Sequence, residues 1–167
     1  LNDASRYGLS LVLGGGEVKL VDQISAYSVF ANGGTARQST GILSVSNNNG
    51  TILESYKDNP TQVLPKNVTL QISDVLSDNN ARRLTFGPTS PLYFPDRQVA
   101  AKTGTTNDFK DLWTIGYTPS LVAGVWAGLN DNTPLYKGIT GSPIWHQFMA
   151  EALKSYPLET FEKPEID

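Results

Sequence analysis

Residues 99–132, "VAAKTGTTNDFKDLWTIGYTPSLVAGVWAGLNDN", decide the fold. The runs at 98–105, 112–117 and 121–129 are rich in β-branched, aromatic and small apolar residues, which favours strands. Thr118-Pro119 is typical of a tight turn, so the second and third strands should pair as an antiparallel hairpin. Because their apolar runs are nearly continuous, we expect both faces of these strands to be covered.

Helical periodicity appears in three other segments. Apolar residues recur at three- and four-residue spacing in 17–34, in 67–84 and in 143–155. In 67–84 we expect one apolar face made of Val68, Ile72, Val75 and Leu76. In 143–155 we expect the corresponding face to consist of Ile144, Phe148, Ala152 and Leu153. Together the patterns predict an α+β fold, an antiparallel sheet flanked by helices.

Two further segments have a different character. The run "GILSVSNNNGTILESY" alternates apolar and polar residues on either side of Asn48-Asn49-Gly50, which predicts a β-hairpin that projects from the body. The last residues, 156–167, are acidic and are expected to form a frayed tail.

The composition excludes several classes of function. The chain has 167 residues, about one domain, with 17% charged residues and a formal net charge of -3. No basic patch stands out, and Arg82-Arg83 is interpreted as a solvated helix end, so no nucleic-acid partner is expected. Without cysteine there is no disulfide, thiolate nucleophile or cysteine-bound metal, and neither a metal nor a cofactor is predicted. No apolar run reaches 18 residues.

The run Lys102-Thr103-Gly104-Thr105-Thr106 carries the chemistry of the first strand. Strand alternation puts Lys102 and Thr103 on opposite faces and gives Thr103 and Thr105 a common face. Gly104 lacks a Cβ, so a ligand can approach the backbone there. On an edge strand, free N–H groups can bind an oxyanion, and the hydroxyls beside a lysine charge can bind a carboxylate.

The stretch that contains this run resembles the third motif of penicillin-binding proteins and the strands that follow it. Likewise, "GGGEVKLVDQISAYSVFANGG" is similar to the long helix upstream of that motif, and "GITGSPIWHQFM" to the C-terminal helix of the same domain. The resemblance covers nearly the whole chain in the correct order. It is strongest to the transpeptidase domain of bifunctional, class A penicillin-binding proteins.

The resemblance implies a role for each residue of the strand. Lys102 would be catalytic, through its positive charge and a contact in a proton network. Thr105 would be catalytic through its backbone N–H, one of two oxyanion donors. The substrate-binding set would be Thr103, Gly104, Thr105 and Thr106. The implied partners are peptidoglycan stem peptides and β-lactam antibiotics, and the implied location is the outer face of the bacterial cytoplasmic membrane, with the anchor outside this chain.

One element of the family is absent from these residues. The family combines Ser-x-x-Lys, Ser-x-Asn and Lys-Thr-Gly, and no Ser-x-x-Lys occurs anywhere in the sequence. The resemblance therefore implies that residues 1–167 are the C-terminal part of one transpeptidase domain. Its missing N-terminal half, or a second copy of this chain, would be a further partner. Alone, the chain is expected to be inactive.

Several residues imitate functional motifs and are interpreted as structural. Ser77-Asp78-Asn79 and Ser46-Asn47-Asn48 spell the second motif but lie at a helix end and in a hairpin turn. The single histidine, His146, is expected to pack rather than to join a catalytic triad. Asp108 and Asp111 are expected to be solvated loop charges. The three tryptophans are expected to fill core volume: Trp113, Trp126 and Trp145. Of these, Trp113 lies near enough to the cleft strand to touch substrate.

Two other classes of function stay open. The chain can be a non-catalytic fragment or a degenerate binding module, or it can come from a serine β-lactamase or β-lactam sensor, which share Lys-Thr-Gly. The glycine-rich run before the first helix and the hairpin "GYTPSLVAGVWAG" favour the penicillin-binding proteins.

Overall fold

The fold is built on one antiparallel sheet, as the sequence predicts. A computed structural model describes residues 7–136 and 138–165. The strands of the sheet pair in the order β5-β6-β7 and are β5 (Ala100–Thr105), β6 (Asp111–Tyr117) and β7 (Val122–Gly128). Each boundary lies within two residues of its prediction. At the turn between β6 and β7, the Thr118 N–H donates to the Leu121 carbonyl at 2.8 Å.

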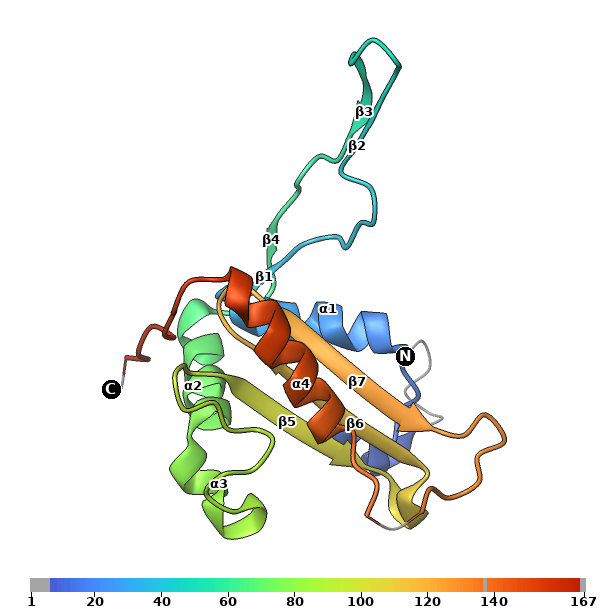
Figure 1. The fold of residues 1–167 in the computed structure, drawn as a ribbon, viewed down its shortest axis with the longest axis vertical. Helices are drawn as coiled ribbons and strands as arrows, with labels where there is room; N and C mark the ends of the chain where they lie inside the picture. Colours follow the sequence, from blue (N-terminus) through green and yellow to red (C-terminus); the bar gives the residue numbers. More distant parts are fainter. Residues whose placement is uncertain (1–6, 137, 166–167) are drawn as a thin grey trace.

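Helices cover both faces of this sheet, which confirms the α+β prediction (Figure 1). On one face lie α1 (Leu20–Ala31) and α2 (Lys66–Ser77). On the other lies α4 (Ser142–Ala152), which the short 3-10 helix η4 (Leu153–Ser155) extends. The core is split by the sheet. Ala101 packs with α4, and its neighbour Ala100 packs with Tyr117 and residues of α1 and α2.

The inward face of α4 differs from the prediction. Leu153 is buried as predicted, but Ile144 and Phe148 are 59% and 56% exposed, and Trp145 and Met149 are buried in their place. The reason is the sheet surface beneath the helix. At Gly116 an added Cβ would lie 2.3 Å from the Trp145 ring, so glycine leaves the space that the indole occupies. The indole Nε1 also donates to the Ala123 carbonyl at 3.0 Å.

The segment predicted as one helix at 67–84 is two helices. The second, α3 (Asn79–Phe86), begins after Asp78, whose carboxylate accepts from the N–H groups of Asn80 and Ala81 at 2.8 and 3.1 Å. An N-cap of this kind satisfies free N–H groups of the new helix. The chain therefore starts a new helix at Asp78 instead of continuing α2.

The predicted apolar face of α2 is correct at Leu76, which packs against the core, and wrong at its other three residues. Thr69 and Ser73 are buried against the sheet, whereas Val68, Ile72 and Val75 are 42%, 37% and 70% exposed. The Ser73 and Tyr117 hydroxyls lie 3.0 Å apart and satisfy each other inside the core. Burial raises the pKa of Tyr117 to about 12.

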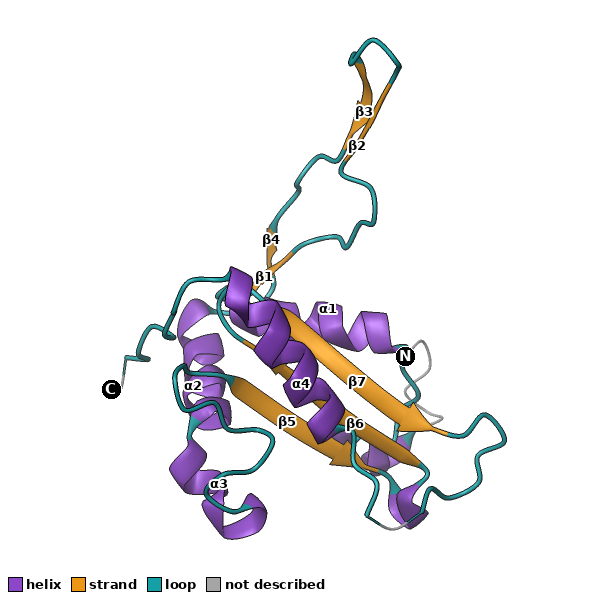
Figure 2. Cartoon of the chain, viewed as in Figure 1, coloured by secondary structure: helices purple, strands orange, loops and turns teal. Residues whose placement is uncertain are grey.

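The predicted hairpin is present and projects from the body, as Figure 2 shows. It consists of β2 (Ser44–Ser46) and β3 (Ile52–Ser55), and Asn47 accepts from the backbone N–H groups of Asn49 and Thr51 at its turn. A second small ladder, β1 (Thr35–Ala36) with β4 (Thr61–Gln62), connects it to the body. No pattern in the sequence predicts this ladder.

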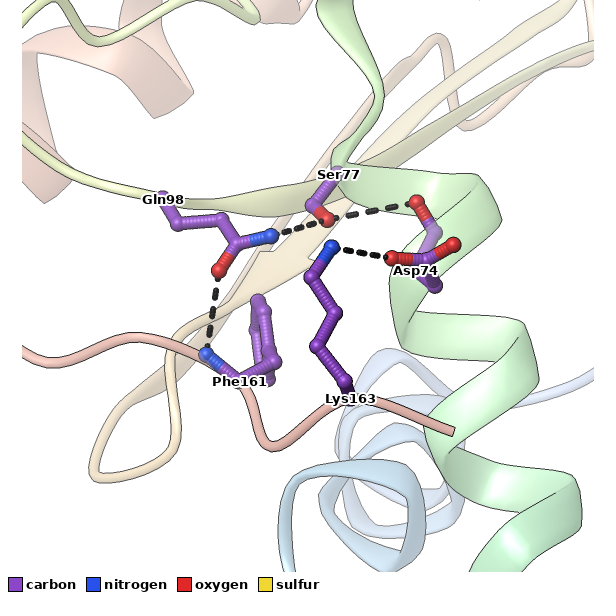
Figure 3. Close-up of polar contacts among 5 residues, drawn as sticks. All are labelled: Asp74, Ser77, Gln98, Phe161 and Lys163. Carbon is purple, nitrogen blue, oxygen red and sulfur yellow. Dashed lines mark hydrogen bonds and ion pairs between the residues drawn. The ribbon is translucent and has the colours of Figure 1, made fainter. Parts of the chain in front are cut away.

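The C-terminal segment is docked and not frayed, as far as residue 165. Phe161 is buried beside Tyr117, with 5.5 Å between ring centroids. Figure 3 shows the polar contacts: the Phe161 N–H donates to Gln98 at 3.0 Å, and Lys163 pairs with Asp74 at 2.9 Å. Burial of one aromatic ring and these contacts hold the segment against α2. Residues 166 and 167 lie outside the described residues.

Candidate functional site

The predicted site residues lie on an edge strand. In the part of the chain that the structure describes, β5 pairs only with β6. Lys102, Gly104 and Thr105 are exposed, and Thr103 is half-buried. The start of β5 lies beside α2 (Figure 1), so the open stretch is its second half.

The pairing of β5 with β6 fixes which backbone groups face the open edge. The Thr106 N–H donates to the Asp111 carbonyl at 3.0 Å, so Thr106 directs its backbone toward β6. In an antiparallel ladder this direction alternates, so Gly104 and Lys102 also face β6. It follows that Thr103 and Thr105 direct their N–H and carbonyl groups to the open edge.

The side chains alternate in the same way. Lys102 shares a face with Ala100, toward α1 and α2, and Thr103 shares a face with Ala101, toward α4. The Lys102 ammonium nevertheless reaches the edge, because its Nζ donates to the Thr103 carbonyl at 2.6 Å. The Lys102 ammonium and the outward N–H groups of Thr103 and Thr105 thus line the open edge, and the two threonine side chains lie on the adjacent face; this arrangement suits a carboxylate or an oxyanion.

Thr106 lies beyond this edge, at the end of the strand. Its hydroxyl accepts from the Asp111 N–H at 2.7 Å and donates to Asp111 Oδ2 at 3.2 Å. The Trp126 indole donates to Asp111 Oδ1 at 2.9 Å. Asp111 is therefore not a solvated loop charge. Trp126 is 38% exposed and polar in its contacts, so the prediction that it fills the core is wrong.

Beside the edge strand is a shallow pocket of about 230 Å³. It lies between α2, α3 and the Lys102–Thr103 part of β5, and its other lining side chains include Val75, Leu76, Asp78, Arg82, Phe86 and Leu92. The lining is mostly apolar, and its charged side chains are Lys102 of β5, Asp78 at the N-cap of α3 and Arg82 of α3. The pocket adjoins the lysine but lies toward the N-terminal half of β5.

Arg82 is a structural residue that the sequence analysis misjudged. It is half-buried, and its guanidinium donates to the carbonyls of Leu76, Asp78 and Leu92. Burial lowers the pKa of Arg82, and the charge of Asp78 acts in the opposite direction. Only its neighbour Arg83 is solvated, so Arg82 connects α2, α3 and the segment that leads into β5.

The residues interpreted as imitations of motifs are structural. Asp78 caps α3, Ser77 Oγ accepts from Gln98 at 2.8 Å, and the Asn79 amide donates to the Pro88 carbonyl at 3.1 Å. His146 stacks on Phe94, with ring centroids 4.4 Å apart. Each of these side chains serves the packing around β5 and not its open edge.

The described residues offer no metal centre and no membrane-spanning helix. Over 7–136 and 138–165, no three His, Asp or Glu side chains gather closely enough to hold a metal ion. In the same ranges, no helix has both the length and the apolar character needed to cross a membrane.

Sequence comparison finds relatives over nearly the whole chain. Penicillin-binding protein 1A of Aquifex aeolicus is 39% identical over 163 residues, which is 93% of this chain and 21% of the relative. Penicillin-binding protein 1A of Rickettsia typhi is 32% identical over 188 residues, 99% of this chain and 24% of the relative. The chain thus spans about a fifth to a quarter of the length of the curated relatives it matches. No protein-family model matches the sequence.

Structure comparison also finds penicillin-binding proteins. The penicillin-binding protein PonA1 from Mycobacterium tuberculosis superimposes with a TM-score of 0.80 at 31% identity, over 94% of this chain and 44% of that one. The fold is that of a penicillin-binding protein transpeptidase domain, with Lys-Thr-Gly on the open edge of its sheet. The chain belongs to the penicillin-binding protein family and is part of such a domain. Within that family, the sequence relatives named above are penicillin-binding proteins 1A.

Proposed function

We propose that residues 1–167 are the C-terminal part of a serine-type D-Ala-D-Ala transpeptidase domain. A serine outside this chain would attack the terminal D-Ala-D-Ala carbonyl of a peptidoglycan stem peptide and release D-Ala. The amine of a second stem would then resolve the acyl-enzyme and form a cross-link, which is ordinary two-step covalent catalysis. β-Lactams would acylate the same serine. The site would act on the outer face of the cytoplasmic membrane, with the anchor outside this chain.

One observation supports this proposal above the others: the open edge of β5. By the ladder alternation described above, the Thr105 N–H points away from β6. In this proposal that N–H is one oxyanion donor, an interaction worth about 3 kcal/mol in comparable sites. The nucleophilic serine would supply the other donor.

The remaining residues of the run hold the substrate. Thr103 and Thr105 share a face and would bind the carboxylate of the substrate or the β-lactam through their hydroxyls. Lys102 would add a positive charge at the same edge, where its Nζ now contacts the Thr103 carbonyl. Gly104 would let the ligand backbone approach. Thr106 would support the site indirectly, since both its backbone N–H and its hydroxyl are bonded to Asp111.

Labelling with a fluorescent penicillin tests the proposal. The complete transpeptidase domain, meaning this chain together with the nucleophile-bearing segment, should gain the mass of one penicillin on a serine outside residues 1–167. The chain alone should gain none, because it has no Ser-x-x-Lys. Intact mass and peptide mapping distinguish the two. An adduct within these 167 residues, or none on the complete domain, would contradict the proposal.

Steady-state turnover of a β-lactam distinguishes a transpeptidase from a β-lactamase. A transpeptidase should keep the penicilloyl group for many minutes, whereas a β-lactamase should release it rapidly and continue to hydrolyse the drug. Rapid hydrolysis by the complete domain would replace the transpeptidase proposal with the β-lactamase alternative.

A further inference from the structure

At one end of the sheet, the carboxylate of Asp111 contacts β7 and the residue that follows β5. Asp111 opens β6, accepts from the Trp126 indole of β7 through Oδ1 at 2.9 Å, and accepts from the Thr106 hydroxyl through Oδ2 at 3.2 Å. Its backbone also pairs with Thr106, through N–H to Oγ1 at 2.7 Å and carbonyl to N–H at 3.0 Å. We call Thr106, Asp111 and Trp126 the β5 end clasp.

The turn that the clasp closes has an unfavourable backbone. Asp108 and Phe109, in the short 3-10 helix η3 (Asn107–Phe109), both have left-handed conformations, with φ of 63° and 56°. Side chains with a Cβ rarely adopt such values, so surrounding contacts must hold the turn in place. The Leu135 N–H donates to the Phe109 carbonyl at 3.0 Å, and the clasp fixes the turn on the side of the strand.

Thr105, the residue next to the clasp, carries the N–H of the proposed oxyanion site. Since β5 pairs only with β6 among the described residues, the position of its last residue depends on the pairing of Thr106 with Asp111. Asp111 holds Thr106 through both its backbone and its carboxylate, and it holds Trp126 through the carboxylate. The clasp therefore restrains the end of β5 beside the Thr105 N–H, whose position the proposed oxyanion contact requires.

We propose that Asp111 is a positioning residue, which holds the Thr105 N–H in place through Thr106 and Trp126. This inference rests on the proposed function. Asp111 would act through Thr106 and Trp126, the two side chains that donate to its carboxylate. Its effect is on the geometry of the acylation transition state, in which charge develops at the oxyanion, and not on the initial binding of the ligand.

The test separates ligand binding from acylation in the complete domain. Stopped-flow measurements with a chromogenic β-lactam give the dissociation constant of the non-covalent complex and the first-order acylation constant. Asp111→Ala should lower the acylation constant about tenfold or more, because an N–H displaced by a fraction of an ångström loses much of its effect. The dissociation constant should change less than about twofold. A thermal melt verifies that each variant is folded.

Two conservative variants decide whether hydrogen bonding is responsible. Asp111→Asn keeps an acceptor for the Trp126 indole and can donate to the Thr106 hydroxyl, so it should recover most of the acylation rate. Trp126→Phe keeps the ring but removes the donor, and should slow acylation several-fold without changing the dissociation constant. If Asp111→Ala fails to fold, the Trp126→Phe result decides the matter by itself.

A matched control comes from the projecting hairpin. Asn47 also accepts two hydrogen bonds with one side chain, from the N–H groups of Asn49 and Thr51 at 3.0 and 2.9 Å. It lies in the turn of the β2–β3 hairpin, which projects away from β5 (Figure 1). Asn47→Ala should leave acylation unchanged. Folded Asp111 and Trp126 variants that acylate at the parent rate would overturn the positioning role. A parent domain that is not acylated at all would instead overturn the proposed function.

Discussion

At the scale of the residue, the candidate site depends on a single charge and on the direction of a few backbone groups. Lys102 is exposed on the face toward α1 and α2, yet its Nζ bends to the Thr103 carbonyl at the open edge. A lysine ammonium in this position requires no burial to act, because an arriving carboxylate supplies the partner charge and excludes water from the edge. Among the described residues Lys102 forms no ion pair, so its charge is available to a ligand.

Replacing this charge should reduce acylation without unfolding the domain. In the complete domain, Lys102→Ala should lower the second-order rate of acylation by penicillin at least tenfold, because the polarising charge is lost. Its melting temperature should change little, since the side chain is exposed. The exposed Lys57 of the hairpin is a suitable control, and Lys57→Ala should acylate like the parent. A Lys102→Ala rate within about twofold of the parent would refute the role of the lysine.

At the scale of the element, α2 is held against the sheet from two sides. On its inner side Ser73 meets the Tyr117 hydroxyl, and on its outer side the C-terminal segment pairs Lys163 with Asp74 and Glu165 with Asn67. Between them Phe161 enters the core beside Tyr117. The segment therefore helps to place α2, and with it the beginning of β5.

Removing the buried ring should cost far more stability than removing the exposed ion pair. In the complete domain, Phe161→Ala should lower the free energy of unfolding by about 3 kcal/mol, as expected for a buried aromatic side chain. Lys163→Ala should cost less than about 1 kcal/mol, since the pair with Asp74 is exposed. Chemical denaturation measures both.

The same segment offers a control for the ring. Leu158 is 69% exposed, so Leu158→Ala should be nearly neutral. A Phe161→Ala change as small as that of Leu158→Ala would show that the segment is not docked in solution.

At the scale of the whole molecule, much apolar surface is left uncovered. Val75 of α2 and Leu84 and Phe86 of α3 are 70%, 99% and 43% exposed, and α4 leaves Ile144 and Phe148 open. Strand β6 is buried on both faces from Thr114 to Tyr117, as its sequence predicts, but β7 is only partly covered. An open strand edge beside apolar helix faces is a surface that another segment should cover.

We therefore expect these 167 residues to associate when they are isolated. The purified chain, free of any co-purified fragment, should self-associate, and co-expression with the nucleophile-bearing segment should yield a soluble one-to-one complex. Light scattering distinguishes the two states, and the complete domain serves as the reference. A monodisperse monomer with a cooperative melt would show that the chain closes its own core.

Local patterns were sufficient for the strands of the sheet and for the hairpin. Strand alternation alone placed Lys102 and Thr103 on opposite faces, because the side-chain period of two follows from the backbone. The turn at Thr118-Pro119 and the Asn-rich hairpin turn depend on residues adjacent in sequence. The chemistry proposed for β5 requires an edge strand, and the strand order β5-β6-β7 places β5 at the edge.

Only the tertiary structure decided which stripe of each helix faces inward. Helical periodicity defines the spacing of a stripe, but α4 has two apolar stripes, and the space left by Gly116 selects the one that contains Trp145. In α2 the hydroxyl of Tyr117 selects Ser73 over its apolar neighbours, because a buried hydroxyl without a partner is costly. The partners of Phe161 and Asp111 are likewise set by contacts between segments distant in the chain, which no local pattern specifies.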